Sequence, residues 1–154
     1  MYQNNNSSRT YGTNNYLQKS EEKIANIHFN EKDEITSNGK DYVDVANDVI
    51  KLLKPGTLTT SKIRSILSMI AEIYKVALID KNQVLNNDIV SQLQYYKIRC
   101  IYEAGRESAV KFFIINANIA GLVKEIGDNK KRLINYYHYM EALVAWFKYN
   151  GGKD

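Results

Sequence analysis

The chain has 154 residues, 44% of them hydrophobic and 25% charged, and its single cysteine excludes an intrachain disulfide and favours a cytoplasmic protein. Its most apolar run is interrupted by Lys111, Asn116 and Asn118, which excludes a membrane-spanning helix there. The net charge of +4 is uneven, because residues 51–154 carry 16 basic and 9 acidic side chains, whereas residues 1–50 carry 5 and 8. This basic part predicts a polyanionic partner. A domain that is basic without such a partner is the alternative.

The first forty residues have the composition of a polar tail. Residues 1–20 are rich in Asn, Ser, Thr and Tyr, and residues 21–40 are polar and acidic. A segment with so few aliphatic side chains cannot bury enough surface to offset the entropy of ordering it. We therefore predict a disordered Asn-rich and acidic tail over residues 1–40, followed by one helical domain over residues 41–150.

From Asp41 onwards the apolar residues recur with the helical period, and helix breakers such as Pro55-Gly56 and Gly127 separate the segments. No strand alternation or hairpin signal is apparent. The sequence therefore predicts an all-α fold, a single five-helix bundle. The expected helices cover about residues 41–53, 60–79, 87–104, 107–126 and 128–149.

A run of three hydroxyl residues marks the start of the second expected helix, which carries two cations in its first turn. Lys62 and Arg64 lie in the first turn, where the helix dipole disfavours cations unless an anion such as a phosphate docks there. Ser61, Arg64, Ser68 and Lys75 share a polar face. Arg64, Ser68 and Lys75 are able to follow a phosphate backbone, although a solvated face explains the same pattern. A helix-turn-helix DNA binder is a third reading, but the link before Asn87 is longer than the usual turn.

Two expected helices carry aromatic side chains on faces other than the one expected to form the core. Tyr95 and Tyr102 share a second apolar face of the third helix, which indicates a helix that is central to the bundle or covered by another subunit. In the fifth helix Tyr139 and Trp146 follow Arg132 at intervals of seven, on the side away from the core. We expect these four aromatic residues at subunit contacts, and the stripe of the fifth helix is also suited to stacking on bases. Packing of the Tyr139 stripe against the first helix or the tail is the alternative.

Catalytic and metal-binding patterns are weak. Two histidines and one cysteine cannot make a His-rich or zinc-knuckle metal site, and no Gly-rich phosphate loop or nucleophile elbow is present. Arg132 and His138 have the spacing of HEPN-type helical ribonucleases, in which the cation binds phosphate and the imidazole does acid–base work. On a continuous helix, however, these residues lie about 120° apart. We therefore expect no enzyme, no metal and no cofactor, with a HEPN-like ribonuclease as the alternative.

Four segments resemble the small subunit of type III-A CRISPR effector (Csm) complexes. They are residues 42–46 (YVDVA), 58–64 (LTTSKIR), 102–106 (YEAGR) and 139–145 (YMEALVA), and the resemblance covers roughly residues 41–149. The TTSKIR and EALVA sequences are its most specific parts. The first forty residues depart from the family's pattern.

The resemblance implies a small, helical, non-catalytic subunit that stacks head to tail in several copies along the guide RNA and its paired target RNA in antiviral defence. Its expected partners are those RNAs, the large polymerase–cyclase subunit and the repeated backbone subunits. Base pairing reads the target sequence, so the subunit needs to contact only backbone and shape. The resemblance implies RNA contacts at Lys54, Lys62, Arg64, Arg99 and Arg106. The basic and hydroxyl pattern adds Thr60, Ser61, Ser68, Lys97, Lys130, Lys131 and Arg132.

Overall fold

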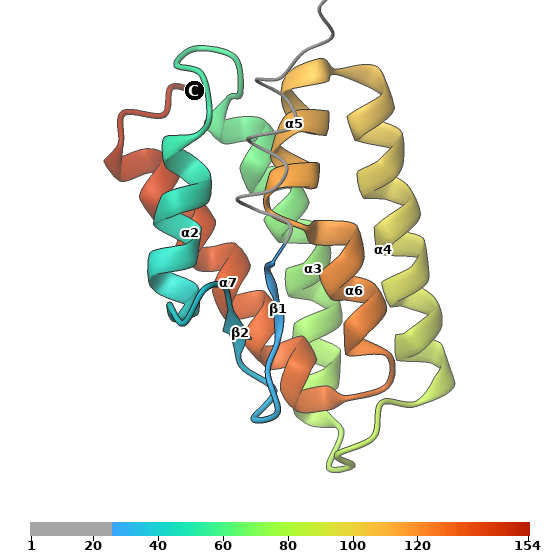
Figure 1. Cartoon of the computed structure of the whole chain (residues 1–154). Helices are drawn as coiled ribbons and strands as arrows, with labels where there is room; N and C mark the ends of the chain where they lie inside the picture. The colour runs from blue at the N-terminus through green and yellow to red at the C-terminus, as the bar shows by residue number, and fades with distance from the viewer. Residues whose placement is uncertain (1–25) are drawn as a thin grey trace, which may run out of the picture.

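The computed structural model describes residues 26–154, which form a helical bundle with a short hairpin packed against it (Figure 1). In the hairpin, Phe29 pairs with Ile35 in an antiparallel register. Within the described residues the fold is mostly helical, as predicted, but it has six helices rather than five and a two-stranded sheet that was not predicted. The elements are β1 (His28–Phe29), β2 (Ile35–Thr36), α2 (Tyr42–Lys51), α3 (Thr60–Ile79), α4 (Asn87–Arg106), α5 (Ser108–Asn116), α6 (Ile119–Ile126) and α7 (Lys130–Tyr149).

Helix α3 has the predicted bounds because its start is capped and its apolar stripe is continuous. The hydroxyl of Thr59 accepts a hydrogen bond from the Lys62 backbone N–H at 3.2 Å. Ile63, Ile66 and Ile70 then recur on the buried side of the helix. The cap and the stripe both lie within one short segment, so the sequence alone specifies this helix.

The predicted fourth helix is in fact two helices, because the chain turns at Asn118. Asn118 has φ 51° and ψ 42°, in the left-handed region that asparagine tolerates better than most residues. Its side-chain amide donates a hydrogen bond to the Ile27 carbonyl at 2.7 Å, so the segment before β1 holds the break in place. A Cβ on Gly121 would collide with the Asn118 side chain, which explains the glycine one turn later.

Residues 26–40 are part of the fold, so the predicted disordered tail was wrong for this stretch. Ile27, Phe29 and Ile35 are each less than a tenth exposed and join the main core. The Phe29 backbone N–H also donates to the Glu125 carboxylate at 2.9 Å. The remainder of the predicted tail, residues 1–25, lies outside the described residues.

Helix α7 packs against three other helices, α2, α3 and α6, while α4 packs against α3, α5 and α6. In Figure 1, α4 forms one edge of the molecule and α2 lies near the other. Most faces of α7 are therefore internal, whereas one face of α4 is free of neighbouring helices. This arrangement determines which of the predicted surface residues reach the surface.

Candidate nucleic-acid interface

The predicted RNA-binding residues are divided between opposite ends of the bundle. The first turn of α3 lies beside the end of α4, because the Lys62 ammonium contacts Glu107 at 2.8 Å. The other end of α3 lies beside the start of α7, because Lys130 donates to the Asp80 carbonyl. Since α3 has 20 residues, these ends are about 30 Å apart. The first end holds Lys54, Ser61, Lys62, Arg64 and Arg106, and the second holds Lys130, Lys131 and Arg132.

The polar face of α3 is exposed, as its spacing predicted. Ser61, Arg64 and Ser68 are all exposed along this face. The Ser68 hydroxyl donates to the Arg64 carbonyl at 2.9 Å, so its proton is already used within the helix. Among the described residues no carboxylate forms an ion pair with the Arg64 guanidinium, which leaves this charge available to a ligand.

Lys62 differs from Arg64, because its charge is neutralised within the protein. Its ammonium lies 2.8 Å from Glu107 and 3.5 Å from Glu103, both at the end of α4. The hydrogen bond with Glu107 raises the pKa of Lys62. The anion that the sequence predicted at this cation is therefore supplied by α4, and Lys62 joins two helices.

Two of the predicted RNA contacts are buried. Thr60 is fully enclosed, and its hydroxyl has no hydrogen-bond partner among the described residues. Lys130 is 8% exposed and its ammonium donates to the Asp80 carbonyl, which anchors the loop after α3 to α7. Neither side chain reaches a surface where RNA would lie, so the predictions for these two residues were wrong. The spacing along one helix does not reveal the loop or neighbour that covers it.

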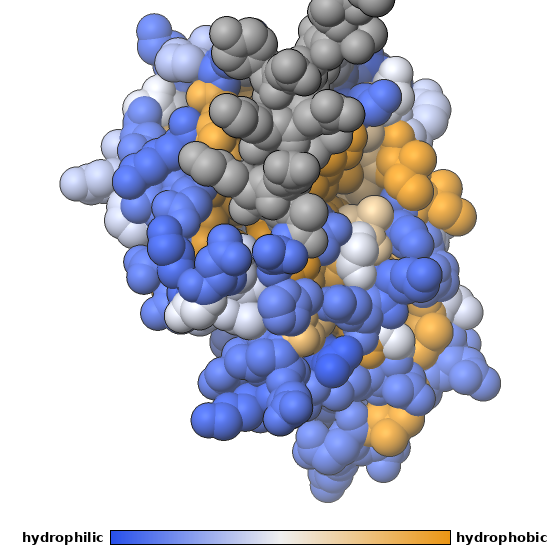
Figure 2. All heavy atoms as spheres, in the orientation of Figure 1, coloured by the Kyte–Doolittle hydropathy of each residue, from blue (hydrophilic) through white to orange (hydrophobic). Residues whose placement is uncertain are grey.

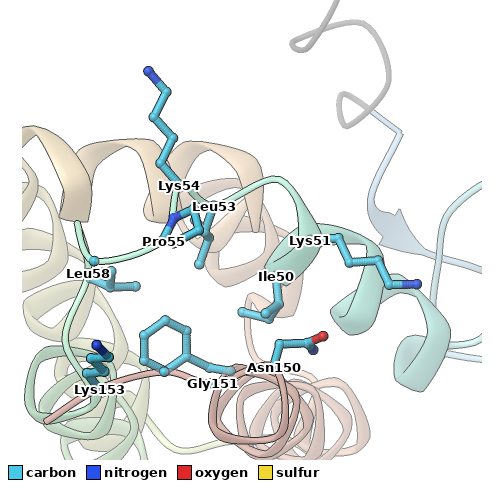
Figure 3. A pocket seen from close by; sticks show the side chains of 12 residues that line it. Ile50, Lys51, Leu53, Lys54, Pro55, Leu58, Asn150, Gly151 and Lys153 are labelled. Carbon is cyan, nitrogen blue, oxygen red and sulfur yellow. The ribbon is translucent and has the colours of Figure 1, made fainter.

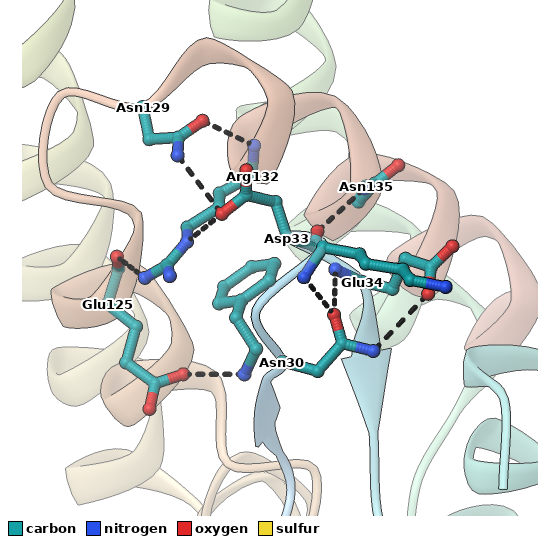
Figure 4. A network of polar contacts seen from close by, with 9 residues as sticks. Asn30, Asp33, Glu34, Glu125, Asn129, Arg132 and Asn135 are labelled. Atoms are coloured by element: carbon teal, nitrogen blue, oxygen red, sulfur yellow. Dashed lines mark hydrogen bonds and ion pairs between the residues drawn. The ribbon is translucent and has the colours of Figure 1, made fainter.

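Arg132 holds the hairpin against α7 (Figure 4). Its guanidinium donates to the Asp33 carboxylate at 2.7 Å and to the Glu125 carbonyl at 2.8 Å, and it lies 5.2 Å from the centre of the Phe29 ring. The hydrogen bond from Arg132 lowers the pKa of Asp33. Of the three consecutive cations that begin α7, Lys131 is the exposed one.

The structure does not bring Arg132 and His138 together. Both lie on the continuous helix α7, and Arg132 faces the hairpin. The His138 ring instead lies 6.1 Å from the rings of Tyr74 and Tyr137, centre to centre, on the side of α7 that meets α3. The two side chains therefore have separate surroundings and do not form an acid–base and phosphate-binding pair within one chain.

The exposed side of α4 combines residues that the sequence assigned to two different roles. Tyr95, Ile98, Ile101 and Tyr102 are each more than half exposed, and Figure 2 shows hydrophobic side chains along this edge of the molecule. We call these four residues, with Arg99 and Arg106, the α4 surface.

Each arginine of the α4 surface accompanies one tyrosine. The Arg106 guanidinium lies 5.6 Å from the centre of the Tyr102 ring, and the Tyr95 hydroxyl raises the pKa of Arg99. The predicted RNA contacts and subunit contacts of this helix therefore share one surface. Lys97 lies on its flank and is half-buried.

The aromatic stripe of α7 faces inward, which corrects the prediction for Tyr139. Tyr139 is fully buried, and its hydroxyl donates to the Ala117 carbonyl at 3.0 Å. Trp146 is half-buried and its indole N–H donates to the Val43 carbonyl of α2 at 3.0 Å, so the stripe packs against the first predicted helix, which was the alternative reading. A subunit contact through the exposed part of Trp146 stays a prediction.

Two exposed lysines near Lys54 were missed. Lys51 ends α2, and Lys153 lies in the segment after α7. The Lys153 carbonyl accepts a hydrogen bond from the Thr60 N–H at 2.8 Å, which brings this segment to the start of α3. No local pattern predicts a contact between segments so far apart in the sequence.

Residues 26–154 contain no group of three or more His, Cys, Asp or Glu side chains placed to hold a metal ion. None of the helices described is both long and apolar enough to cross a membrane.

Comparison with known proteins identifies the relatives of this chain. The family model described as "Csm2 Type III-A" matches residues 36–153. The "CRISPR system Cms protein Csm2" of Streptococcus thermophilus is 42% identical over 120 residues, which cover 75% of this chain and 95% of the relative. The protein of the same name from Mycobacterium tuberculosis (strain CDC 1551 / Oshkosh) is 37% identical over 117 residues, or 74% of this chain and 94% of the relative. That from Enterococcus italicus is 37% identical over 94 residues, covering 60% and 67%.

Proposed function

Because this chain belongs to the Csm2 family of type III-A CRISPR systems, the small subunit of the Csm complex, we propose that it is a structural RNA-binding subunit without catalytic activity. Several copies stack head to tail along the paired guide and target RNA and contact the RNA backbone. The large polymerase–cyclase subunit and the repeated backbone subunits are its protein partners. The subunit works in the cytoplasm, in antiviral defence, and needs no cofactor.

The observation that carries RNA binding is the exposure of Arg64 and Lys54 at one end of the bundle, where no carboxylate of the described residues forms an ion pair with either. Cations scattered over several elements suit a backbone, because phosphates repeat regardless of sequence. Guide–target pairing already reads the sequence, so the protein needs no side chains that read bases. Arg99 extends the cationic surface along α4, next to Arg106, whose guanidinium lies 3.5 Å from the Glu103 carboxylate.

Arg64 is tested by titrating the chain with a labelled single-stranded RNA at increasing salt. We expect Arg64→Gln to reduce the slope of log affinity against log salt by about 0.7, the value for one lost phosphate contact. Lys75→Gln is the matched control, because Lys75 lies on the same helix and pairs with Glu72 at 3.0 Å. Lys62→Gln is expected to leave the slope unchanged. A wild-type slope for Arg64→Gln removes Arg64 from the RNA surface.

Stacking in a head-to-tail manner requires two different sticky patches on each copy. The α4 surface is one candidate. The other is a set of exposed apolar side chains around the end of α3 and in the loop that follows. This set consists of Val76, Leu78, Ile79 and Val84.

Mixing two variants tests the stacking model. Ile98→Glu blocks the α4 surface and Ile79→Glu blocks the other patch, so each variant alone is expected to lose concentration-dependent self-association in sedimentation velocity. A mixture retains one intact contact and is expected to form dimers only. Ile115→Glu is the control, because Ile115 is a half-exposed apolar residue of α5 outside both patches. Unchanged self-association of Ile98→Glu would rule out the α4 surface.

The ribonuclease alternative has a direct test. The purified chain is expected to leave labelled RNA intact, with the same result for His138→Ala. Cleavage by the wild type that disappears in His138→Ala would establish the nuclease instead.

A further inference from the structure

A groove of 510 Å³ lies at the end of the bundle where α2 and α7 finish (Figure 3). It runs between the loop that joins α2 to α3 and the segment that follows α7. Its floor is apolar and three lysines are among its lining residues, with the side chains of Lys51 and Lys54 extending outward (Figure 3). The apolar residues are Ile50, Leu53, Pro55, Leu58 and Phe147, and the cations are Lys51, Lys54 and Lys153.

The walls of the groove are fixed by specific backbone contacts. Gly151 has φ 88°, and the Gly152 N–H donates to the Phe147 carbonyl at 2.9 Å. A Cβ on Gly152 would collide with the Phe147 ring, so the segment lies directly against that ring. The Lys153 carbonyl then accepts a hydrogen bond from the Thr60 N–H at 2.8 Å. The segment after α7 is therefore held by contacts with both α7 and the start of α3, and these contacts define the shape of the groove.

The charged residues that line the groove are all basic. No carboxylate is among its lining residues, and none of its three lysines forms an ion pair with a carboxylate of the described residues. The ends of α2 and α7 carry partial negative charge that favours nearby cations, but helix ends do not explain an apolar floor between them. A ligand that matches both features has a flat apolar part and negatively charged groups on either side.

We propose that this groove binds one unpaired nucleotide of an RNA strand. The base lies on the apolar floor beside the half-buried Leu53, and the flanking phosphates contact Lys51, Lys54 and Lys153. The volume falls within the range of about 300–1,000 Å³ typical of sites for small organic ligands. The proposal rests on the proposed RNA-binding function and adds to it a site for a base, which backbone contacts alone do not need.

The test compares two probes with the full chain by fluorescence anisotropy at low salt. One is a labelled oligouridine of ten nucleotides, and the other is the same chain with an abasic ribose at every position, which keeps all phosphates. The wild type is expected to bind the oligouridine about five- to tenfold more tightly, because contact of one base with the groove removes apolar surface from water. Leu53→Ser is expected to remove this preference and to leave the salt dependence unchanged.

Lysine variants test the phosphate contacts of the same site. Lys51→Gln with Lys153→Gln is expected to weaken binding of both probes and to lower the salt slope by about 1.4, for two lost contacts. Lys81→Gln with Lys124→Gln removes the same charge from exposed positions outside the groove and is expected to change the slope less. Thermal unfolding of each variant shows whether it is folded.

The outcomes separate the groove from the general function. Equal, salt-sensitive binding of the two probes by the wild type would overturn the proposed nucleotide site in the groove, but it would agree with the proposed RNA-binding function. A preference for bases that persists in Leu53→Ser would also overturn it. If the wild type binds neither probe, both the proposed function and the groove fail.

Discussion

The Cys100 thiol is buried in the core on the inward face of α4, next to the hydroxyl of Tyr96. Burial raises the pKa of Cys100 to about 11, so the unreactive thiol form predominates near neutral pH. We predict that a disulfide reagent such as DTNB leaves the folded chain unmodified at pH 8 and reacts completely in guanidinium chloride. Release of a full equivalent of thionitrobenzoate from the folded chain within seconds would contradict the burial.

The contribution of Asp33 to the stability of the fold depends on pH. The hydrogen bond from Arg132 lowers the pKa of Asp33 in the folded state. Its contribution to stability is therefore complete above the unfolded pKa of about 3.9 and is lost as the pH falls through the lower folded pKa. We predict that wild type and Asp33→Asn differ by a constant free energy of unfolding above pH 5, and that the difference shrinks below pH 4. Urea unfolding from pH 6 to pH 2.5 measures it, and a difference that does not change with pH would refute the ion pair.

The sequence predicts individual side chains well only when their neighbours lie on the same helix. The exposure of Arg64 and Ser68 follows from the apolar stripe of α3, and the structure agrees with it. The pairing of Lys62 with Glu107 and the burial of Lys130 depend on a second element, which periodicity does not identify. The charge pattern therefore overestimates the number of cations that are available to RNA.

At the scale of elements, Asn118 decides where α5 ends and α6 begins. We predict that Asn118→Ala lowers the free energy of unfolding by about 2 kcal/mol, because alanine is strained in the left-handed conformation and cannot bond the Ile27 carbonyl. Asn118→Gly loses only the hydrogen bond and is expected to cost less. Urea denaturation compares the two variants. An alanine variant as stable as the glycine variant would show that the backbone conformation does not matter there.

The hairpin shows why short strands escape prediction. In the structure, residues 27–29 and 35–36 alternate between buried and less buried side chains, but these segments are shorter than the runs of about 4–8 residues that predict a strand. Each strand has only two residues, however, and besides the contact between the two strands their burial depends on α2, α6 and α7. The sequence predicts long helices from local information, but an element of this size exists only because distant elements cover it.

For the whole molecule, the buried hairpin residues move the start of the domain to before residue 41. We predict that the free energy of unfolding of a chain starting at residue 41 is at least about 3 kcal/mol lower than that of a chain starting at residue 26. It lacks Ile27, Phe29 and Ile35, and burying a large apolar side chain contributes about 1.5–3 kcal/mol as an upper estimate. Thermal and urea unfolding of the two chains test this. Equal stability would restore the predicted boundary at residue 41.

The candidate site is the part of the molecule that the sequence predicts least well. Twelve RNA contacts were expected, at Lys54 in the loop after α2 and along α3, α4 and α7, without a prediction of how these elements sit relative to one another. The helices separate Lys54 and Arg64 from Lys131 by about the length of α3. The groove lined by Lys51 and Lys153 arises where segments about a hundred residues apart meet, so only the folded chain reveals it.

The contact between Asp33 and Arg132 also has a consequence for the order of events during protein synthesis. The two residues are 99 positions apart, so the hairpin leaves the ribosome well before its partner helices exist. At about 5–20 residues per second, Ile27, Phe29 and Ile35 wait roughly 5–20 s before α6 and α7 emerge to cover them. During this interval the nascent chain exposes apolar side chains that chaperones are able to bind. The hairpin is buried only after the C-terminal helices have been synthesised.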